Sequence, residues 1–115
     1  ITPDAIRIIQ SEVGQVFIED SVLDYILRWV VATRKHDHFL IGISPRGAIA
    51  LRRVAQARAL VEGRNYVIPS DVDRSIRPVF AHRIVSNRSR GSDRIPGVGF
   101  VEAELSAIAQ SIELP

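Results

Sequence analysis

The sequence predicts an all-α fold, a small helical bundle of four main helices plus a C-terminal helix, with at most short extended segments. Two observations lead to this class. Apolar residues recur every three or four positions over most of the chain, as they do along amphipathic helices. Three of these stretches begin with a proline, which is favoured in the first turn of a helix because its missing N–H needs no partner there.

The composition fits one soluble domain with a single core. Of the 115 residues, 46% are hydrophobic and 24% are charged, the balance of a globular chain rather than a disordered one. There is no cysteine, which excludes disulfides and thiolate zinc sites. We find no membrane-spanning run and no secretory leader, so we expect a cytoplasmic protein. Because the chain starts at Ile1 rather than Met, we also expect it to be a segment of a longer protein.

The charged residues weigh against ATP hydrolysis by this chain alone. A P-loop (Walker A) needs a Gly-Lys-Ser/Thr sequence, and Lys35, the only lysine, lies between Arg34 and His36. Residues 16–20 offer too few apolar positions for a Walker B strand with its acidic pair. The 15 basic and 13 acidic residues leave a net charge of +2, which is weak evidence for a nucleic-acid partner.

The first helix is predicted from about Pro3 to Val13. Thr2 supplies a capping hydroxyl, and the apolar residues that follow have helical spacing. Gly14 is expected to end this helix, and residues 16–18 form a short extended run.

The second helix has the most regular pattern in the chain. Asp20 or Ser21 is its expected cap, and the helix should fray near residues 36–38. Tyr25 and Trp29 are expected to lie beside the buried stripe. The stripe itself consists of Val22, Leu23, Ile26, Leu27, Val30 and Val31.

The third helix is predicted from Pro45 to about Glu62. Its apolar residues lie on nearly every side, so we expect a central helix with neighbours packed around it. Gly63 should follow its C-cap in a left-handed conformation.

A fourth helix is predicted to open at Pro69, after an extended segment at 66–68. Pro78 should kink or end it, because the proline ring lacks a donor and clashes with the preceding turn. Asp71 and Asp73 fall in its first turn, where the helix dipole stabilises acids, so we interpret them as capping residues rather than as an acid–base pair. Its buried face consists of Val72, Ile76, Val79 and Phe80.

The C-terminal part divides into a loop and a closing helix. Residues 86–99 are rich in serine, arginine, glycine and proline, which predicts a flexible loop. A closing helix is expected over 100–113, with a packing stripe that is too short for a coiled coil. The single domain, 1–115, thus has a core at 1–85 followed by these two segments. The stripe consists of Val101, Leu105, Ile108 and Ile112.

The turn before the third helix is the leading candidate for a functional site. It contains Gly42, and Ser44 and Pro45 suit the N-cap and the first helical position. Arg46 then places a cation at the positive end of the helix dipole, which disfavours it by about 0.3 to 1 kcal/mol at an exposed site. This placement is explained if an anion such as phosphate binds Arg46 and the free backbone N–H groups together. A solvated arginine is the alternative explanation.

The histidines are the candidate metal ligands. His36 and His38 flank Asp37, and a histidine pair at this spacing can bind zinc. No third ligand with suitable spacing follows, so we expect no metal site and interpret both residues as capping the second helix.

These motifs resemble the C-terminal lid domain of MoxR-type AAA+ ATPases. The resemblance covers residues 1–85 closely and the final helix loosely. It rests on Gly42-Ile43-Ser44-Pro45-Arg46, on Glu62-Gly63-Arg64-Asn65-Tyr66-Val67-Ile68-Pro69-Ser70-Asp71-Val72, and on Pro78-Val79 and His82-Arg83.

The resemblance implies a function for the turn. In that family the lid covers the ATP site of a preceding P-loop domain, and the arginine of the Gly-x-Ser-Pro-Arg turn is the sensor 2 residue, which contacts the γ-phosphate. Arg46 is then catalytic only together with the missing ATPase core, and Gly42, Ser44 and Pro45 join it on the phosphate side of the site. ATP and Mg²⁺ would be cofactors of the parent protein, and neither would bind tightly to this chain.

The resemblance also implies partners. They are the preceding AAA+ core domain of the same chain, neighbouring subunits in a ring that is commonly a hexamer, and proteins with von Willebrand A domains. Family members act as chaperone-like remodelers, and neither a membrane span nor a nucleic acid is expected.

Two positions depart from the family pattern. Gly47 stands where alanine is usual, which could loosen the turn because glycine destabilises a helix. Ile68 stands where threonine is usual, which removes a capping hydroxyl. We therefore expect Ser70 to act as N-cap with Asp73, so that the fourth helix begins one or two residues later.

Two other functions stay open on sequence alone. Arg46, Arg52 and Arg53 could form a basic nucleic-acid-binding surface, whose affinity would fall steeply with salt. The stripe of the closing helix could instead dock on another protein in a purely structural module.

Overall fold

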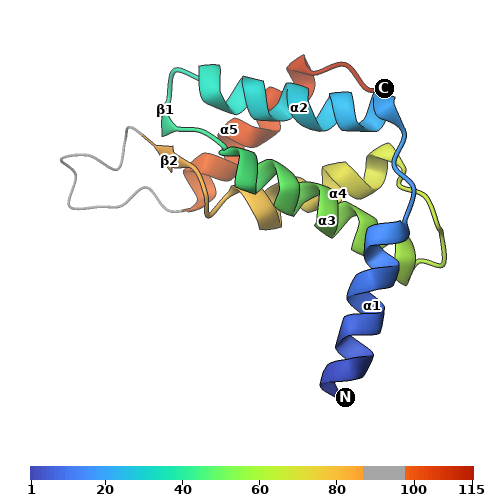
Figure 1. Cartoon of the computed structure of the whole chain (residues 1–115). Helices are drawn as coiled ribbons and strands as arrows, with labels where there is room; N and C mark the ends of the chain where they lie inside the picture. Colours follow the sequence, from blue (N-terminus) through green and yellow to red (C-terminus); the bar gives the residue numbers. More distant parts are fainter. Residues whose placement is uncertain (87–97) are drawn as a thin grey trace.

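The computed structural model describes residues 1–86 and 98–115, and this part of the chain confirms the all-α class (Figure 1). Two short strands, β1 (Phe39–Ile41) and β2 (Val85–Ser86), pair antiparallel. The flexible loop predicted over 86–99 lies largely outside the described residues. The helices are α1 (Pro3–Gln15), α2 (Asp20–Lys35), α3 (Pro45–Val61), α4 (Pro69–Phe80) and α5 (Val98–Ser111).

Helix α3 lies at the centre of the bundle, as predicted. It contacts α1, α2 and α4, and α5 packs against α2. The neighbours do not cover α3 completely, since Ile49 and Val61 are exposed. Helix α1 projects away from the body of the molecule (Figure 1), and none of its side chains is buried in the described structure. None of the described helices is both long and apolar enough to cross a membrane.

The core joins α2, α3, α4 and α5. Trp29 of α2 meets Phe80 of α4 edge to face, with ring centroids 6.4 Å apart. Leu51 of α3 is fully buried in the same cluster. Helix α5 begins and ends two residues earlier than the predicted 100–113, but its stripe packs as expected. Its buried members are Val101, Leu105 and Ile108.

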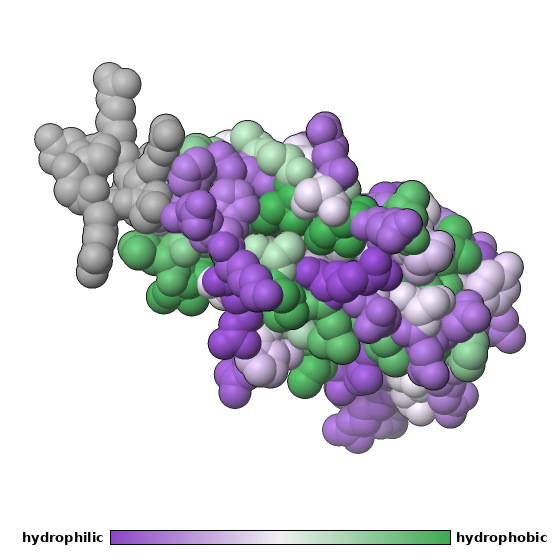
Figure 2. All heavy atoms as spheres, turned by 90° about the horizontal axis from the view of Figure 1, so that it is seen from above, coloured by the Kyte–Doolittle hydropathy of each residue, from purple (hydrophilic) through white to green (hydrophobic). Residues whose placement is uncertain are grey.

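The buried face of α2 differs from the predicted one. Leu27 and Val31 are 56% and 47% exposed, whereas Tyr25 and Trp29 are almost fully buried. The large aromatic side chains remove more apolar surface from water, so the helix is rotated toward them. Seen from above (Figure 2), hydrophilic and hydrophobic side chains accordingly lie side by side on the exposed surface. The buried residues of α2 are Val22, Tyr25, Ile26, Trp29, Val30 and Thr33.

Two predictions at the ends of α1 and α2 are wrong. Helix α1 continues through Gly14 to Gln15, because Gly14 keeps a negative φ and a glycine ends a helix by turning left-handed. Helix α2 is capped by neither Asp20 nor Ser21. Its N-cap is Glu19, whose carbonyl oxygen accepts hydrogen bonds from the backbone N–H groups of Val22 and Leu23.

The end of α3 confirms the role of Gly63. Gly63 has a φ of 82°, and its N–H donates to the carbonyl of Leu60 at 3.0 Å. The N–H of Arg64 donates to the carbonyl of Ala59 at 2.8 Å. These two bonds form a Schellman motif, which stops the helix and turns the chain toward α4.

Helix α4 begins at Pro69 rather than later, and Ser70 is not its N-cap. The N-cap is Ile68, whose N–H donates to a carboxylate oxygen of Asp71 at 2.9 Å. Asp71 thus supplies the return half of a capping box, and its own N–H donates to the carbonyl of Ile68 at 2.9 Å in place of the missing hydroxyl. Pro78 stands two residues before the end of α4 at Phe80, as predicted.

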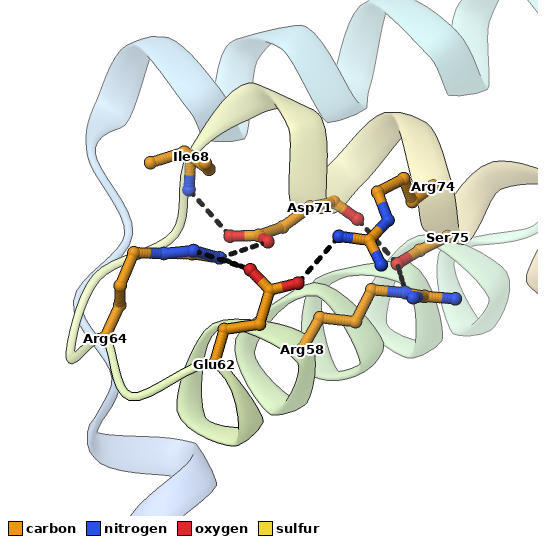
Figure 3. A network of polar contacts seen from close by, with 7 residues as sticks. All are labelled: Arg58, Glu62, Arg64, Ile68, Asp71, Arg74 and Ser75. Atoms are coloured by element: carbon orange, nitrogen blue, oxygen red, sulfur yellow. Dashed lines mark hydrogen bonds and ion pairs between the residues drawn. The ribbon is translucent and has the colours of Figure 1, made fainter.

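A network of polar contacts joins the end of α3 to the start of α4 (Figure 3). Asp71 is buried and accepts a hydrogen bond from the guanidinium of Arg64 at 2.5 Å. Arg64 also pairs with Glu62 at 3.0 Å, and Arg74 pairs with Glu62 at 2.7 Å. The carboxylate of Asp71 is both ion-paired and hydrogen-bonded to a backbone N–H. These contacts offset the free-energy cost of burying its charge.

Asp73 faces away from this network. Its carboxylate accepts a hydrogen bond from the phenol of Tyr25 at 2.6 Å, which links α4 to α2. Asp73 is therefore a helix–helix contact rather than the predicted cap. Burial and the bond to Asp73 raise the pKa of Tyr25 to about 12.

We expect Asp71→Ala to destabilise the domain by about 3 kcal/mol, because it removes one partner of a buried ion pair together with the cap of α4. Asp24→Ala removes only an exposed pair with Arg28 and should cost less than about 1 kcal/mol. Urea unfolding followed by circular dichroism measures both. An equal loss of unfolding free energy in the two variants would show that the burial of Asp71 adds nothing to stability.

Tyr25 predicts a loss of stability at high pH. The phenol ionises near pH 10 in the unfolded chain and at about 12 in the folded chain, so its stabilising effect is complete below pH 10 and disappears as pH rises toward 12. Phenolate absorbance measured in a Tyr66→Phe variant reports Tyr25 alone, since the chain has two tyrosines. A midpoint near pH 10, with the circular dichroism still native, would contradict the expectation.

Candidate functional site

The turn before α3 is tied to α2 by one buried hydroxyl. The backbone N–H of Ile43 donates to Oγ1 of Thr33 at 3.1 Å. The hydroxyl of Thr33 in turn donates to the carbonyl of Val30 at 2.7 Å. Thr33 is fully buried and Ile43 is nearly so, which fixes the turn against the last part of α2.

Gly42 is required by the closeness of this approach. A Cβ atom at position 42 would lie 2.7 Å from Cα of Arg34 and 2.8 Å from the carbonyl carbon of Thr33. Both are backbone atoms of α2, so neither can rotate out of the way. Only glycine lets the turn lie this close to the helix.

The start of α3 matches the sequence prediction. Ser44 is the N-cap and its Oγ accepts from the N–H of Gly47 at 3.2 Å. Pro45 has no N–H, so Arg46 supplies the remaining donor of the first turn. That N–H finds no acceptor within the part of the chain that the structure describes.

The side chain of Arg46 is exposed, and among the residues of 1–86 and 98–115 it has no ion-pair partner. A free guanidinium and a free backbone N–H thus belong to the same residue. Both are donors, and both lie at the positive end of α3. This arrangement can bind an oxyanion without moving any secondary structure.

A hollow of about 300 Å³ adjoins the turn. Gly42, Ser44 and Pro45 line it from the turn and Arg34 lines it from α2, while Arg46 is not part of its wall. Sequence reasoning did not assign a role to Arg34. Its place directly after Thr33, in a part of the chain that fits the resemblance, is the signal that could have indicated one. The full lining is Arg34, Leu40, Ile41, Gly42, Ile43, Ser44 and Pro45.

Gly47 has a packing role that its sequence position did not reveal. It is buried, and a Cβ atom there would lie 2.8 Å from Cγ2 of Ile43 and 3.4 Å from Cδ of Arg83. The glycine lets Ile43 pack tightly under the first turn of α3. It also brings the aliphatic stem of Arg83, a third arginine, next to the turn.

The other arginines of α3 lie elsewhere. Arg52 and Arg53 line a separate hollow of about 540 Å³ between α3 and the end of α1. The candidate phosphate site therefore consists of the turn, Arg46 and the neighbouring Arg34.

Comparisons with known proteins identify the family of this domain. Residues 31–99 match the family model of the AAA lid domain. The uncharacterized protein YeaC of Bacillus subtilis is 35% identical over 105 residues, covering 91% of this chain and 33% of YeaC. Chaperone MoxR1 of Mycobacterium tuberculosis is 32% identical over 123 residues, covering 99% of this chain and 31% of MoxR1.

A solved structure supports the same assignment. The crystal structure of a proposed ATPase from Cytophaga hutchinsonii superposes with a TM-score of 0.77 at 28% identity, covering 91% of this chain and 33% of that one. This chain spans about a third of the length of these relatives. It belongs to the AAA lid domain family, as the lid of a MoxR-type AAA+ ATPase.

Proposed function

We propose that this lid covers the ATP site of a preceding P-loop domain and that Arg46 is its sensor 2 residue. The observation that carries the proposal is the pair of unpartnered donors on Arg46, within the described structure, at a helix start that Thr33 and Gly42 hold in place. The parent protein would supply the nucleotide and its Mg²⁺, and the nucleotide provides the phosphoryl group that is transferred to water.

The chemistry of arginine suits this role. The planar guanidinium of Arg46 can bridge two phosphate oxygens and stabilise negative charge that develops during phosphoryl transfer. Oγ of Ser44 accepts the N–H of Gly47 and so caps α3, while its hydroxyl proton is still available to donate to a phosphate oxygen. Arg34, on the wall of the adjacent hollow, places a second cation toward the same anion.

Exposed apolar residues beside the turn support the proposal that another domain packs against this part of the lid. Leu40 and Ile41 of β1, Val85 of β2 and Ile49 of α3 are each more than 40% exposed. Apolar side chains gathered around a cationic site are a typical contact surface for another domain. We propose that the ATPase core covers them, so that loss of the γ-phosphate releases Arg46 and lets the lid move.

The wider context of this function follows the family. We propose assembly into a ring, commonly a hexamer, in which lid movement couples ATP hydrolysis to chaperone-like remodeling. Proteins with von Willebrand A domains are the proposed partners of the assembled ring.

We expect Arg46→Ala to lower the ATP turnover of the full-length protein by about tenfold or more, because one charged donor at the phosphate is lost. Arg53→Ala is the matched control, since Arg53 is an exposed arginine of α3 that lines a different hollow. Steady-state ATPase assays compare the two, and thermal melts confirm that both variants fold. Full activity of Arg46→Ala would overturn the sensor assignment.

Gly42→Ala tests whether the position of the turn matters. The added methyl meets the backbone of α2, so we expect a destabilisation of about 1 to 3 kcal/mol and reduced ATP turnover in the full-length protein. At Gly14, inside α1, a Cβ atom meets nothing within 4 Å. Gly14→Ala should therefore leave turnover unchanged and stability equal or higher. Equal behaviour of the two variants would contradict the steric argument.

A further inference from the structure

We propose that His36, His38 and Glu104 form a binding site for one zinc ion, which fastens α5 to the end of α2. His36 is the C-cap of α2, His38 follows it in the turn before β1, and Glu104 comes from α5. The missing third ligand thus lies far away in sequence, which is why sequence spacing gave no sign of it. One potential ligand atom from each residue lies within 4.8 Å of those of the others.

Each imidazole lies close to one oxygen of the Glu104 carboxylate. Nε2 of His36 lies 3.0 Å from Oε2 of Glu104, and Nδ1 of His38 lies 3.3 Å from Oε1. Ligand atoms of a tetrahedral zinc ion, bound at about 2.0 to 2.2 Å, are separated by about 3.3 Å. An ion bound by one oxygen of Glu104 would draw both imidazole nitrogens toward that oxygen, from within the 4.8 Å that now contains the three ligand atoms.

Nδ1 of His38 is not held by a hydrogen bond. This atom is shielded from solvent and makes no hydrogen bond within the described structure, and its charged neighbour is Oε1 of Glu104 at 3.3 Å. The remaining part of the ring is open, since the side chain is 45% exposed. The ring of His36 is held by stacking on Phe39 at 4.5 Å between centroids. The site is thus partly ordered and can be reached from solvent.

The ligand set selects the metal. Two imidazole nitrogens and one carboxylate suit zinc, with a water molecule as the fourth ligand. Mg²⁺ and Ca²⁺ prefer sets made of oxygen atoms. The proposed site is therefore independent of the Mg²⁺ that accompanies ATP in the parent protein.

One local contact must change when zinc binds. Nδ1 of His36 accepts a hydrogen bond from the backbone N–H of His38 at 3.1 Å, so the neutral ring carries its proton on Nε2. For Nε2 to bind the metal, that proton must move to Nδ1, and the N–H of His38 must turn away. This rearrangement weakens binding, so we expect micromolar rather than nanomolar affinity.

The consequence concerns the attachment of α5. This helix lies almost wholly beyond the matched AAA lid region, and it packs on α2 through an apolar stripe. A zinc ion would add a coordinate link across the same two helices, at the end of α2 that lies next to Thr33 and the phosphate turn.

Zinc titration of the tag-free, chelator-treated 115-residue chain tests the proposal. Isothermal calorimetry should give one ion per chain, and His38→Gln and Glu104→Gln should each weaken binding by about tenfold or more. Saturating zinc should raise the Tm of the unmodified chain by about 5 °C but not that of these variants. His82→Gln and Glu102→Gln are the controls, because both residues lie outside the cluster.

A measurement on the unmodified chain does not depend on how the variants fold. In NMR spectra of the three histidine rings, zinc should shift the signals of His36 and His38 and leave those of His82 unchanged. Absence of saturable binding at about 1 mM zinc, or unchanged affinity in folded His38→Gln and Glu104→Gln, would overturn the proposal. So would equal shifts of all three rings.

Discussion

The hydroxyl of Thr33 is the contact on which the rest of the site depends. A buried hydroxyl needs hydrogen-bond partners, and this one takes the carbonyl of Val30 and the N–H of Ile43. The first bond is local to α2, and the second reaches the turn before α3. Through this single side chain, the end of one helix sets the start of the next. The position of Arg46 in the first turn of α3 follows from that placement.

The second fixed point is the junction of α3 and α4. There the carboxylate of Asp71 holds Arg64 and also caps α4, so the turn at Gly63 and the start of α4 are set together. The hydroxyl of Ser75 accepts from Arg58 of α3 and donates to the carbonyl of Asp71, which extends the link by one helical turn. Helix α3 is therefore held at both ends by buried polar groups.

The sequence allowed prediction of the features that depend on neighbouring residues. The N-cap at Ser44 and the left-handed Gly63 are decided within a few positions, and both were predicted correctly. The face that α2 buries was not, because its apolar residues and its aromatic residues form adjacent stripes of the same period. Only the packing of α3, α4 and α5 against α2 decides between them.

Contacts between distant segments could not be predicted from the sequence either, because they too depend on how the helices pack. The bond from Tyr25 to Asp73 and the approach of Glu104 to the histidines depend on how helices cross, not on spacing within one helix. The residues of the candidate phosphate site could be proposed from the sequence because they lie in a single turn, and their role stays a prediction. Its second cation, Arg34, was not assigned, because the fold brings it to the turn from another helix.

The attachment of α1 allows a movement of this helix to be transmitted through α3. The segment that follows α1 is attached to α3, since the amide of Gln56 donates to the carbonyl of Val16. Phe17 also bridges to Tyr66, in the connection between α3 and α4. Ten residues separate Gln56 from Arg46, which is about 15 Å along one rigid helix. A twist of α1 relative to the bundle enters α3 near Gln56. Because α3 is one continuous helix, such a rotation would move Arg46 together with Gln56.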